Sequence, residues 1–368
     1  MTSIDIHVIQ SVPPSNINRD DNGSPKTAVY GGSRRARVSS QAWKRATREA
    51  YDQILDHKDL GHRTKRVAEL IAEQIQDMRP ETAADKAVGA AWEVLSALKL
   101  KEEKGKKASE GAPETQYLVF FSNSQIRRLA ELAVANDLGK VAPKEAKAIA
   151  KAEHGVSLSL FGRMIADDPD LNVDAAVQVA HAISTHAVDS EFDFYTAVDD
   201  HNRDDESGAG MMGTIEFNSS TMYRYATISL EALHENLGDA EAAKRAVEAF
   251  LTGFVKSMPS GKQNTFGNGT LPHGIVVVAR KGQGVSWVGA FEDAVAATGH
   301  GYVQTSCESL AQHATDLADA YGEEPAASWV TTVGDKARPL QNLGVSVAFP
   351  ELVTHVGDYV REHVSELA

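Results

Sequence analysis

The residues best suited to chemistry in this sequence are six cations that surround one predicted helix start. They are Arg34, Arg35, Arg37, Lys44, Arg45 and Arg48. Between them, Ser39 or Ser40 can cap a helix, because a side-chain hydroxyl accepts a hydrogen bond from an N–H group of the first turn. A helix start carries unpaired N–H groups and partial positive charge, so hydroxyls and cations there suit a phosphate-bearing ligand. The segment predicts a polyanion-binding site.

The helix that must position these cations is predicted from about Ser40 to Leu55. Its apolar residues recur at helical spacing and should face a core: Trp43, Ala46, Ala50 and Ile54. Ser40, Lys44 and Arg48 share another face. Taken alone, the arginines before the helix could be a solvated turn, as charge runs usually are. The capped amphipathic helix that follows favours binding.

Composition limits how such a site can work. The chain has 368 residues, 42% of them hydrophobic and 24% charged, which is ordinary for a globular protein with two or three core-forming units. Its formal net charge of −14 argues against indiscriminate binding to nucleic acid or to anionic membranes, so any nucleic-acid site must be local. The single cysteine, Cys307, excludes an internal disulfide and a multi-cysteine zinc site.

Targeting and cofactor signals point to a cytoplasmic protein without bound groups. The N-terminus lacks a signal-peptide pattern, and no apolar run approaches the roughly 20 residues of a membrane helix. No P-loop, dinucleotide fingerprint or serine–histidine nucleophile motif occurs. We therefore expect no cofactor, no resident metal and no membrane partner.

The order of predicted elements indicates an α+β fold. Residues 4–12 alternate as a half-buried strand that ends near Pro13-Pro14, and an alanine-rich stretch at about 60–180 reads as a helical subdomain. The later elements are a strand near 192–197, a strand over 215–230, a helix over 239–256 and a strand over 275–279. Without the inserts the order is βαββαβ, the ferredoxin-like plan that RNA-recognition domains also use.

Several motifs in sequence order resemble one family. They are Ile6-His7-Val8, Asn18-Arg19-Asp20-Asp21, Gly31-Gly32 through Lys44-Arg45-Ala46, Gly162-Arg163-Met164, His181-Ala182-Ile183-Ser184-Thr185-His186, Val188-Asp189-Ser190, Thr196-Ala197-Val198-Asp199-Asp200 and Tyr223-Arg224-Tyr225-Ala226. On these residues the chain resembles the CasC-type backbone subunit of the type I-E CRISPR Cascade complex, in the RAMP superfamily. The resemblance spans residues 1 to about 300.

The resemblance implies a ferredoxin-like or RRM-like palm, an inserted helical fingers domain and a protruding thumb loop. The implied boundaries are palm 1–59, fingers 60–180, a palm strand 181–198, thumb tip 199–214 and the rest of the palm 215–368. It implies a non-catalytic subunit that polymerises as a helical filament along CRISPR RNA and presents the guide for pairing with target DNA in antiviral defence. The implied partners are CRISPR RNA, target DNA, neighbouring copies of the chain and other Cascade subunits.

The family's guide contacts carry over to individual residues. Around the palm helix and fingers they are Arg19, Lys26, Ser40, Gln41, Lys44, Arg45, Arg48 and Arg163, and in the loop after the second helix they are Lys262, Gln263 and Asn264. Met164 and Met212 fall where the family has apolar wedges against bases, with Phe194, Tyr195 and Thr196 at the thumb base. The aromatic signature of ordinary RNA-recognition strands is absent, so base stacking on the sheet is not supported.

The alternative is a metal-dependent RAMP ribonuclease. Its candidate ligands are Asp199, Asp200, His201, Asp204, Asp205 and Glu206. We favour the scaffold, because a metal site needs ligands held on rigid elements and these residues lie in a polar, glycine-rich loop. That loop ends in Met211 and Met212, which suggest a contact but could also pack internally. His181 and His186 would point about 140° apart on a helix, a poor metal pair, and are expected to be structural.

Overall fold

The computed structural model describes residues 1–103, 112–165, 167–197 and 211–367. The predicted thumb tip therefore lies largely outside the described residues, as do all six candidate ribonuclease ligands. The chain forms two compact units. The first contains residues 1–50, 179–227 and 250–356, and the second contains residues 51–178, 228–249 and 357–368.

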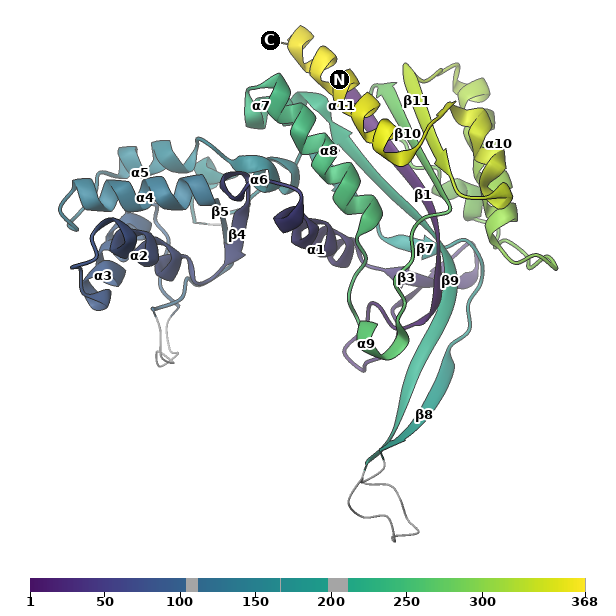
Figure 1. Cartoon of the computed structure of the whole chain (residues 1–368), viewed down its shortest axis with the longest axis horizontal. Helices are drawn as coiled ribbons and strands as arrows, with labels where there is room; N and C mark the ends of the chain where they lie inside the picture. The colour runs from purple at the N-terminus through teal and green to yellow at the C-terminus, as the bar shows by residue number, and fades with distance from the viewer. Residues whose placement is uncertain (104–111, 166, 198–210, 368) are drawn as a thin grey trace. The chain divides into compact units, whose positions relative to one another are not determined.

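The first unit is built on a large mixed sheet (Figure 1). Its strands follow the order β12-β11-β10-β1-β9-β7-β3-β2, and β8 pairs with β9. Their bounds are β1 Thr2–Ser15, β2 Thr27–Tyr30, β3 Ser33–Val38, β7 Ala182–Ser184, β8 Glu191–Ala197, β9 Met211–Ser229, β10 Gly274–Lys281, β11 Ala327–Thr332 and β12 Val345–Ser346. The expected α+β class and the strands near 4–12, 192–197, 215–230 and 275–279 are confirmed.

Strand β1 is buried on both faces, so the expectation of a half-buried strand was wrong. Helix α10 (Val303–Tyr321) covers one face, where Ile9 joins a core with Val276 and Leu310. Asp5 and His7 on that face each have a hydrogen-bond partner inside the core. Asp5 accepts hydrogen bonds from the Tyr225 hydroxyl at 2.9 Å and the Val285 N–H at 3.0 Å, so burial of its carboxylate is offset.

Helix α1 spans Ser40–Ala50, about one turn less than predicted, and a short 3₁₀ turn at Tyr51–Gln53 follows it. Trp43 and Ala46 are buried as expected, whereas Ile54 is 37% exposed and does not join the core, because it lies beyond the helix. Ser39 is the cap: its hydroxyl oxygen accepts from the Ala42 N–H at 3.3 Å. The predicted capped, amphipathic character is confirmed.

The second unit is mainly helical, as the alanine-rich composition predicted. Its helices include α2 (Val67–Met78), α3 (Ala84–Ala97), α4 (Asn123–Ala135), α5 (Pro143–Ala150), α6 (Gly155–Phe161) and α7 (Leu230–Leu237). Helices α2 to α5 share one core that includes Ile71, Val94 and Leu129. A two-stranded sheet of β4 (Gly61–Thr64) and β5 (Val119–Ser122) and a capping box at Ser122 and Gln125 complete it.

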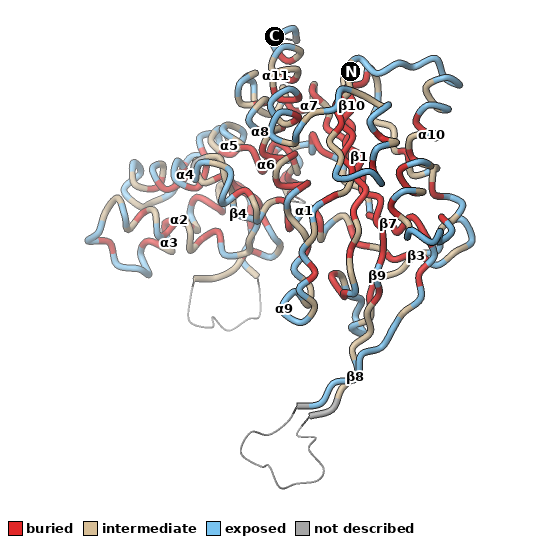
Figure 2. Tube along the Cα trace, turned by 45° about the vertical axis from the view of Figure 1, so that its right-hand side comes forward, coloured by how far each residue is buried: buried red, intermediate tan, exposed pale blue. Residues whose placement is uncertain are grey.

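The remaining elements are β6 (Val177–Val179), at the boundary between the units, α8 (Ala240–Lys256), α9 (Gln263–Phe266), α11 (Phe349–Leu367) and 3₁₀ turns that include Val288–Phe291 and Asp335–Leu343. Helix α8 matches the predicted helix at 239–256. Figure 2 shows buried segments along β1, β10 and the sheet part of β9, while the outer part of the β8 ribbon is exposed.

Candidate nucleic-acid interface

The loop after β1 is hydrogen-bonded to the start of α1. The side-chain oxygen of Asn18 accepts from the Ser39 N–H at 2.8 Å, and the Asn18 carbonyl accepts from the Lys26 N–H at 2.9 Å. The Lys26 carbonyl in turn accepts from the Arg37 N–H at 2.8 Å. These bonds hold the loop of Arg19 and Lys26 beside the capped helix start, so these sequence-predicted contacts come together with Ser40.

The pKa of His181 reflects the positive charge of this surface. Its Nδ1 lies 3.4 Å from the Ser40 N–H nitrogen and 3.3 Å from Nη1 of Arg37. Burial, followed by the positive charges of Arg37 and Lys26, lowers the pKa of His181. The imidazole is therefore held neutral as an acceptor, and the cations around it keep their charge for an external anion.

His181 and His186 lie on either side of strand β7, within the segment predicted as a palm strand, so the helical spacing used to judge them as a metal pair does not apply. His186 stacks on Tyr302 with ring centroids 3.6 Å apart, and its Nε2 accepts from the Thr221 N–H at 3.0 Å. Both histidines have internal partners, as the expected structural role requires.

The loop before α9 approaches the same surface. A side chain at Gly261 would place its Cβ 2.4 Å from the carbonyl oxygen of Ile17, so only glycine allows this close approach. Lys262 follows in the left-handed region with φ +51°, and Gln263 and Asn264 are exposed at the start of α9. The structure thus brings the predicted contacts of this loop next to those of the Arg19 loop.

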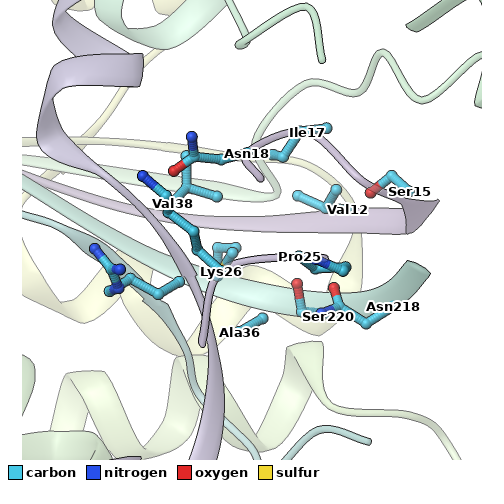
Figure 3. A pocket seen from close by; sticks show the side chains of 12 residues that line it. Val12, Ser15, Ile17, Asn18, Pro25, Lys26, Ala36, Val38, Asn218 and Ser220 are labelled. Carbon is cyan, nitrogen blue, oxygen red and sulfur yellow. The ribbon is translucent and has the colours of Figure 1, made fainter. Parts of the chain in front are cut away.

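A small pocket lies beneath this surface (Figure 3). It is lined by loop residues such as Asn18 and Lys26, and by Asn218 and Ser220 of β9. Its volume is about 10 Å³, room for one water molecule. A nucleotide cannot enter it, so a polyanion would have to contact the outer surface formed by the loop, the helix start and α1.

On α1 itself, Gln41 and Arg45 point outward and Lys44 and Arg48 are half-buried. Arg45 donates from Nε to Glu49 at 2.7 Å, which partly neutralises its charge. We give Arg45 less weight than Lys44 and Arg48, because those two share the Ser40 face of the helix and Arg45 does not.

Arg35 corrects the idea that all six cations face a ligand. Its side chain is fully buried, and its guanidinium donates to the carbonyls of Ser184, Thr185, Phe291 and Glu292 at 2.9 to 3.1 Å. The β2–β3 turn packs on the same segment, since a Cβ on Gly31 would lie 1.6 Å from the Glu292 carbonyl oxygen. Arg35 fixes the hairpin, and its buried guanidinium is out of reach of a phosphate.

Strands β8 and β9 form a two-stranded ribbon (Figure 1). It carries exposed aromatic side chains. Phe192, Phe194 and Tyr195 are 69%, 64% and 43% exposed. Thr196 is exposed as well, and its ladder partner is Met212, whose side chain is outside the described set. At the base of the ribbon, the ring centroids of Phe217 and Phe266 of α9 are 5.7 Å apart. This contact joins the ribbon to the Lys262 loop.

In the second unit, Arg163 and Met164 are neighbours with opposite surroundings. Arg163 is 5% exposed and donates to the carbonyls of Leu171, Phe120 and Ala150. Burial lowers its pKa to about 10. We therefore assign Arg163 a structural role in place of the expected RNA contact, while Met164 is 80% exposed and available to a ligand.

Sequence reasoning missed the residues that organise this surface, above all Asn18 and His181. Asn18 was noted only as part of a loop, although asparagine after a strand commonly bonds to nearby backbone. The partner of His181, the helix start at Ser40, lies far away in the sequence, so no local pattern could have shown the contact.

Within residues 1–103, 112–165, 167–197 and 211–367, no group of three or more histidine, cysteine, aspartate or glutamate side chains could hold a metal ion. None of the helices in these ranges combines the length and apolar character needed to cross a bilayer.

The geometry defines a mixed α+β protein with a cationic surface made of one loop, one helix start and a second loop. The sequence matches the family described as CT1975-like protein over residues 4–355. The chain belongs to this CT1975-like family. The match extends past residue 300, where the sequence motifs had carried little information.

Two solved structures are also similar to this chain. A chain of a "CRISPR RNA-guided surveillance complex, pre-nicking" is 36% identical, with a TM-score of 0.88 over 97% of this chain and 100% of that one. A second, from a "CRISPR RNA-guided surveillance complex", is 32% identical, with a TM-score of 0.73 over 97% of this chain and 99% of that one. No curated protein matched. The resemblance to CasC-type Cascade subunits is confirmed.

Proposed function

We propose that this protein is a non-catalytic, CRISPR RNA-binding backbone subunit of a Cascade surveillance complex. The observation that carries the proposal is the cationic surface of the first unit, in a chain that is 36% identical over nearly its full length to a subunit of an RNA-guided complex. Cations and N–H groups bind phosphates without reading sequence, which suits a subunit that must accept any guide.

The strand order supports the finer architecture of a ferredoxin-like palm. In the order β10-β1-β9-β7, helix α1 precedes β7 and helix α8 precedes β10. The first and third core strands are then central and the second and fourth flank them, as in a βαββαβ sheet. We assign the helical insertion between α1 and β6 as the fingers and the β8–β9 ribbon as the base of the thumb.

In this proposal, phosphates contact Arg19, Lys26, Lys44, Arg48 and Lys262, with Ser40 and Gln41 donating hydrogen bonds. Copies of the chain polymerise along the guide, and the exposed aromatic side chains of the ribbon interrupt base stacking without reading bases. The guide remains open for pairing with target DNA, and other Cascade subunits complete the particle.

The test is light scattering of the full chain with and without CRISPR RNA in magnesium, followed by a denaturing gel of the recovered RNA. Large particles with intact RNA are expected. RNA cut at regular intervals would favour the ribonuclease alternative, and an unchanged monomer with intact RNA would contradict assembly by this chain alone.

A variant pair tests the surface itself. Log affinity falls as log salt concentration rises, and the double variant Lys44→Ala/Arg48→Ala should make this fall less steep. The magnitude of the slope should drop by about 1.4, which is about 0.7 for each lost phosphate contact. Arg45→Ala removes a charge from the same helix and should change the slope less, because Arg45 lies off the face that Ser40, Lys44 and Arg48 share. Equal slopes for wild type and the double variant would show that α1 is not the phosphate contact.

A further inference from the structure

An asparagine followed by a glycine occurs at two places in this chain, Asn22-Gly23 and Asn268-Gly269. This pair of residues is chemically labile in water, because glycine has no side chain to hinder attack of its backbone nitrogen on the preceding asparagine amide. The two places have different surroundings. Asn22 and Gly23 are both exposed, whereas Asn268 is 2% exposed. Folding therefore leaves the first pair open to solvent and covers the asparagine of the second.

The reacting groups of the exposed pair are lightly held. Asn22 donates its backbone N–H to the Asp20 carboxylate at 2.9 Å, but its side chain has no hydrogen-bond partner among the residues that the structure describes. The Gly23 N–H donates to the Asp20 carbonyl at 3.2 Å, at the long end of the usual range. Because this turn is exposed, its backbone bonds open readily, and the Gly23 nitrogen is then free to approach the Asn22 amide.

The backbone at Gly23 leaves room for this approach. Gly23 has φ +88°, and a Cβ built on it would meet nothing within 4 Å. No neighbouring side chain or backbone segment is packed against this side of the turn. Ring closure between the two residues therefore displaces no packed group.

We infer that Asn22, and not Asn268, is a site of spontaneous deamidation. The backbone nitrogen of Gly23 attacks the side-chain amide carbon of Asn22. A bond from this nitrogen to Cγ forms, the Cγ–Nδ2 bond breaks, and ammonia leaves with the proton that the Gly23 nitrogen loses. One water molecule then opens the cyclic imide at either of its carbonyls. The products are aspartate and isoaspartate, in which the main chain runs through the side-chain carbon.

Either product adds a negative charge to a loop that carries two proposed phosphate contacts. Arg19 and Lys26 lie on either side of Asn22 in this loop, and Arg19 is exposed. A carboxylate beside these cations lowers the positive potential that attracts a polyanion. This consequence for RNA binding rests on the proposed function, whereas the deamidation itself does not.

Isoaspartate would also change the shape of the loop. The Gly23 carbonyl accepts from the Asn16 side chain at 2.9 Å, and the Asp20 N–H donates to the Ser24 carbonyl at 2.9 Å. The extra main-chain carbon of isoaspartate lies between the two residues that each bond joins. These bonds cannot both keep their length, so we expect isoaspartate at position 22 to weaken RNA binding more than aspartate does.

Mass spectrometry of the full chain, aged at mildly alkaline pH and then digested with trypsin, tests the reaction. Trypsin cleaves after Arg19 and Lys26 and releases residues 20–26 as one peptide. We expect this peptide to gain the mass difference between an amide and an acid, and to separate into aspartate and isoaspartate forms, of which protein isoaspartate methyltransferase labels the second. The peptide that contains Asn268 should keep that amide. An unaged sample digested in parallel corrects for conversion during digestion.

The variant Asn22→Gln is the matched control. It keeps the amide but moves the amide carbon one methylene further from the Gly23 nitrogen, so the ring closes far more slowly. RNA affinity is compared for fresh and aged samples of both chains. We expect aged, fully converted wild type to bind CRISPR RNA about threefold more weakly than fresh wild type, a change typical of one surface charge. Aged Asn22→Gln should bind like fresh Asn22→Gln, and fresh Asn22→Asp should show a smaller loss than the converted chain.

An unchanged peptide 20–26 after ageing would overturn the proposal, because the folded turn would then hold the pair in an unreactive geometry. Equal conversion of Asn268 would overturn it too, since exposure would not select the site. Conversion of Asn22 without a change in RNA affinity would overturn the link to the Arg19 loop. If even the fresh chain bound no RNA, the proposed function would fall, and the mass measurement would still decide whether Asn22 deamidates.

Discussion

The guanidinium carbon of Arg224 lies 3.6 Å from the centre of the Trp43 ring, so strand β9 holds helix α1 through a buried cation stacked on an aromatic face. Phe254 of α8 lies on the same cation at 4.3 Å, and the Phe254 carbonyl accepts from the guanidinium. Nη1 donates to Gln10 at 2.5 Å. Because Gln10 also bonds to Thr270, Arg224 and Gln10 together connect the cationic helix to the segment that leads into β10.

Replacement of Arg224 should therefore destabilise the first unit. Arg224→Met keeps much of the volume but leaves the Gln10 side-chain oxygen and the Phe254 carbonyl without a donor, and we expect a loss of about 3 kcal/mol in the free energy of unfolding. Denaturant unfolding measures it. Arg245→Met, at an exposed position of α8, is the control and should change stability by less than about 0.5 kcal/mol. Equal stability of the two variants would contradict the role of Arg224.

Arg35 shows where sequence reasoning stops. A cap at Ser39 or Ser40, the burial of Trp43 and Ala46 and the helix at 239–256 follow from local spacing and were predicted correctly. Arg35 and Arg37 have the same residue type and differ by two positions, yet the carbonyls that bind Arg35 come from residues 184–185 and 291–292. Only the folded sheet brings those carbonyls together, so a run of cations could not reveal which one is structural.

Contacts with distant residues also explain why β1 is buried on both faces. Alternation of Ile4, Asp5, Ile6 and His7 indicates one polar face, but Tyr223, Tyr225 and Arg280 supply polar partners inside the core. At the interface, the surface built by Asn18, His181 and Gly261 depends on contacts between distant segments. Its cations were predictable from the sequence, and their arrangement was not.

The neighbours Arg163 and Met164 should separate stability from binding. Arg163→Ala removes a donor from three buried carbonyls, and of these the Ala150 carbonyl keeps the Gln125 side chain as another donor. We expect the free energy of unfolding of the second unit to fall by about 3 kcal/mol. Met164→Ala, at a side chain 80% exposed, should leave thermal unfolding unchanged. If Arg163→Ala instead unfolded like wild type and bound RNA weakly, Arg163 would be a guide contact after all.

Acid should destabilise the second unit through His154. Burial, aided by the positive charge of Arg163, lowers the pKa of His154 from 6.5 to about 4. Below pH 6.5 His154 binds a proton in the unfolded chain but stays neutral in the native protein, so stability falls as the pH drops from about 6.5 to 4. Each pKa unit corresponds to about 1.4 kcal/mol, and partial exposure of the imidazole reduces the effect. The free energy of unfolding should therefore fall by about 1 to 3 kcal/mol.

Native His154 accepts at Nδ1 from the Gln125 side chain at 3.2 Å, a contact that protonation would break. His154→Gln keeps an acceptor without the titration, so its unfolding free energy should depend less on pH over this range. Chemical unfolding at several pH values compares the two chains. An identical pH dependence would assign the acid effect to other buried histidines, such as His7 and His186, whose pKa values are also lowered.

Lys262 has a strained backbone conformation and is also a proposed phosphate contact. Two substitutions distinguish the effect of the strain on stability from the effect of the charge on RNA binding. Lys262→Gly and Lys262→Ala both remove the charge, so each should lower the salt slope of RNA binding by about 0.7. Glycine adopts φ +51° freely, whereas alanine keeps the strain, so Lys262→Gly should be the more stable variant by up to about 1 kcal/mol. Equal stability would mean the loop relaxes on its own. Wild-type affinity and slope in both variants would exclude Lys262 as a phosphate contact, because charge is the property that both lose.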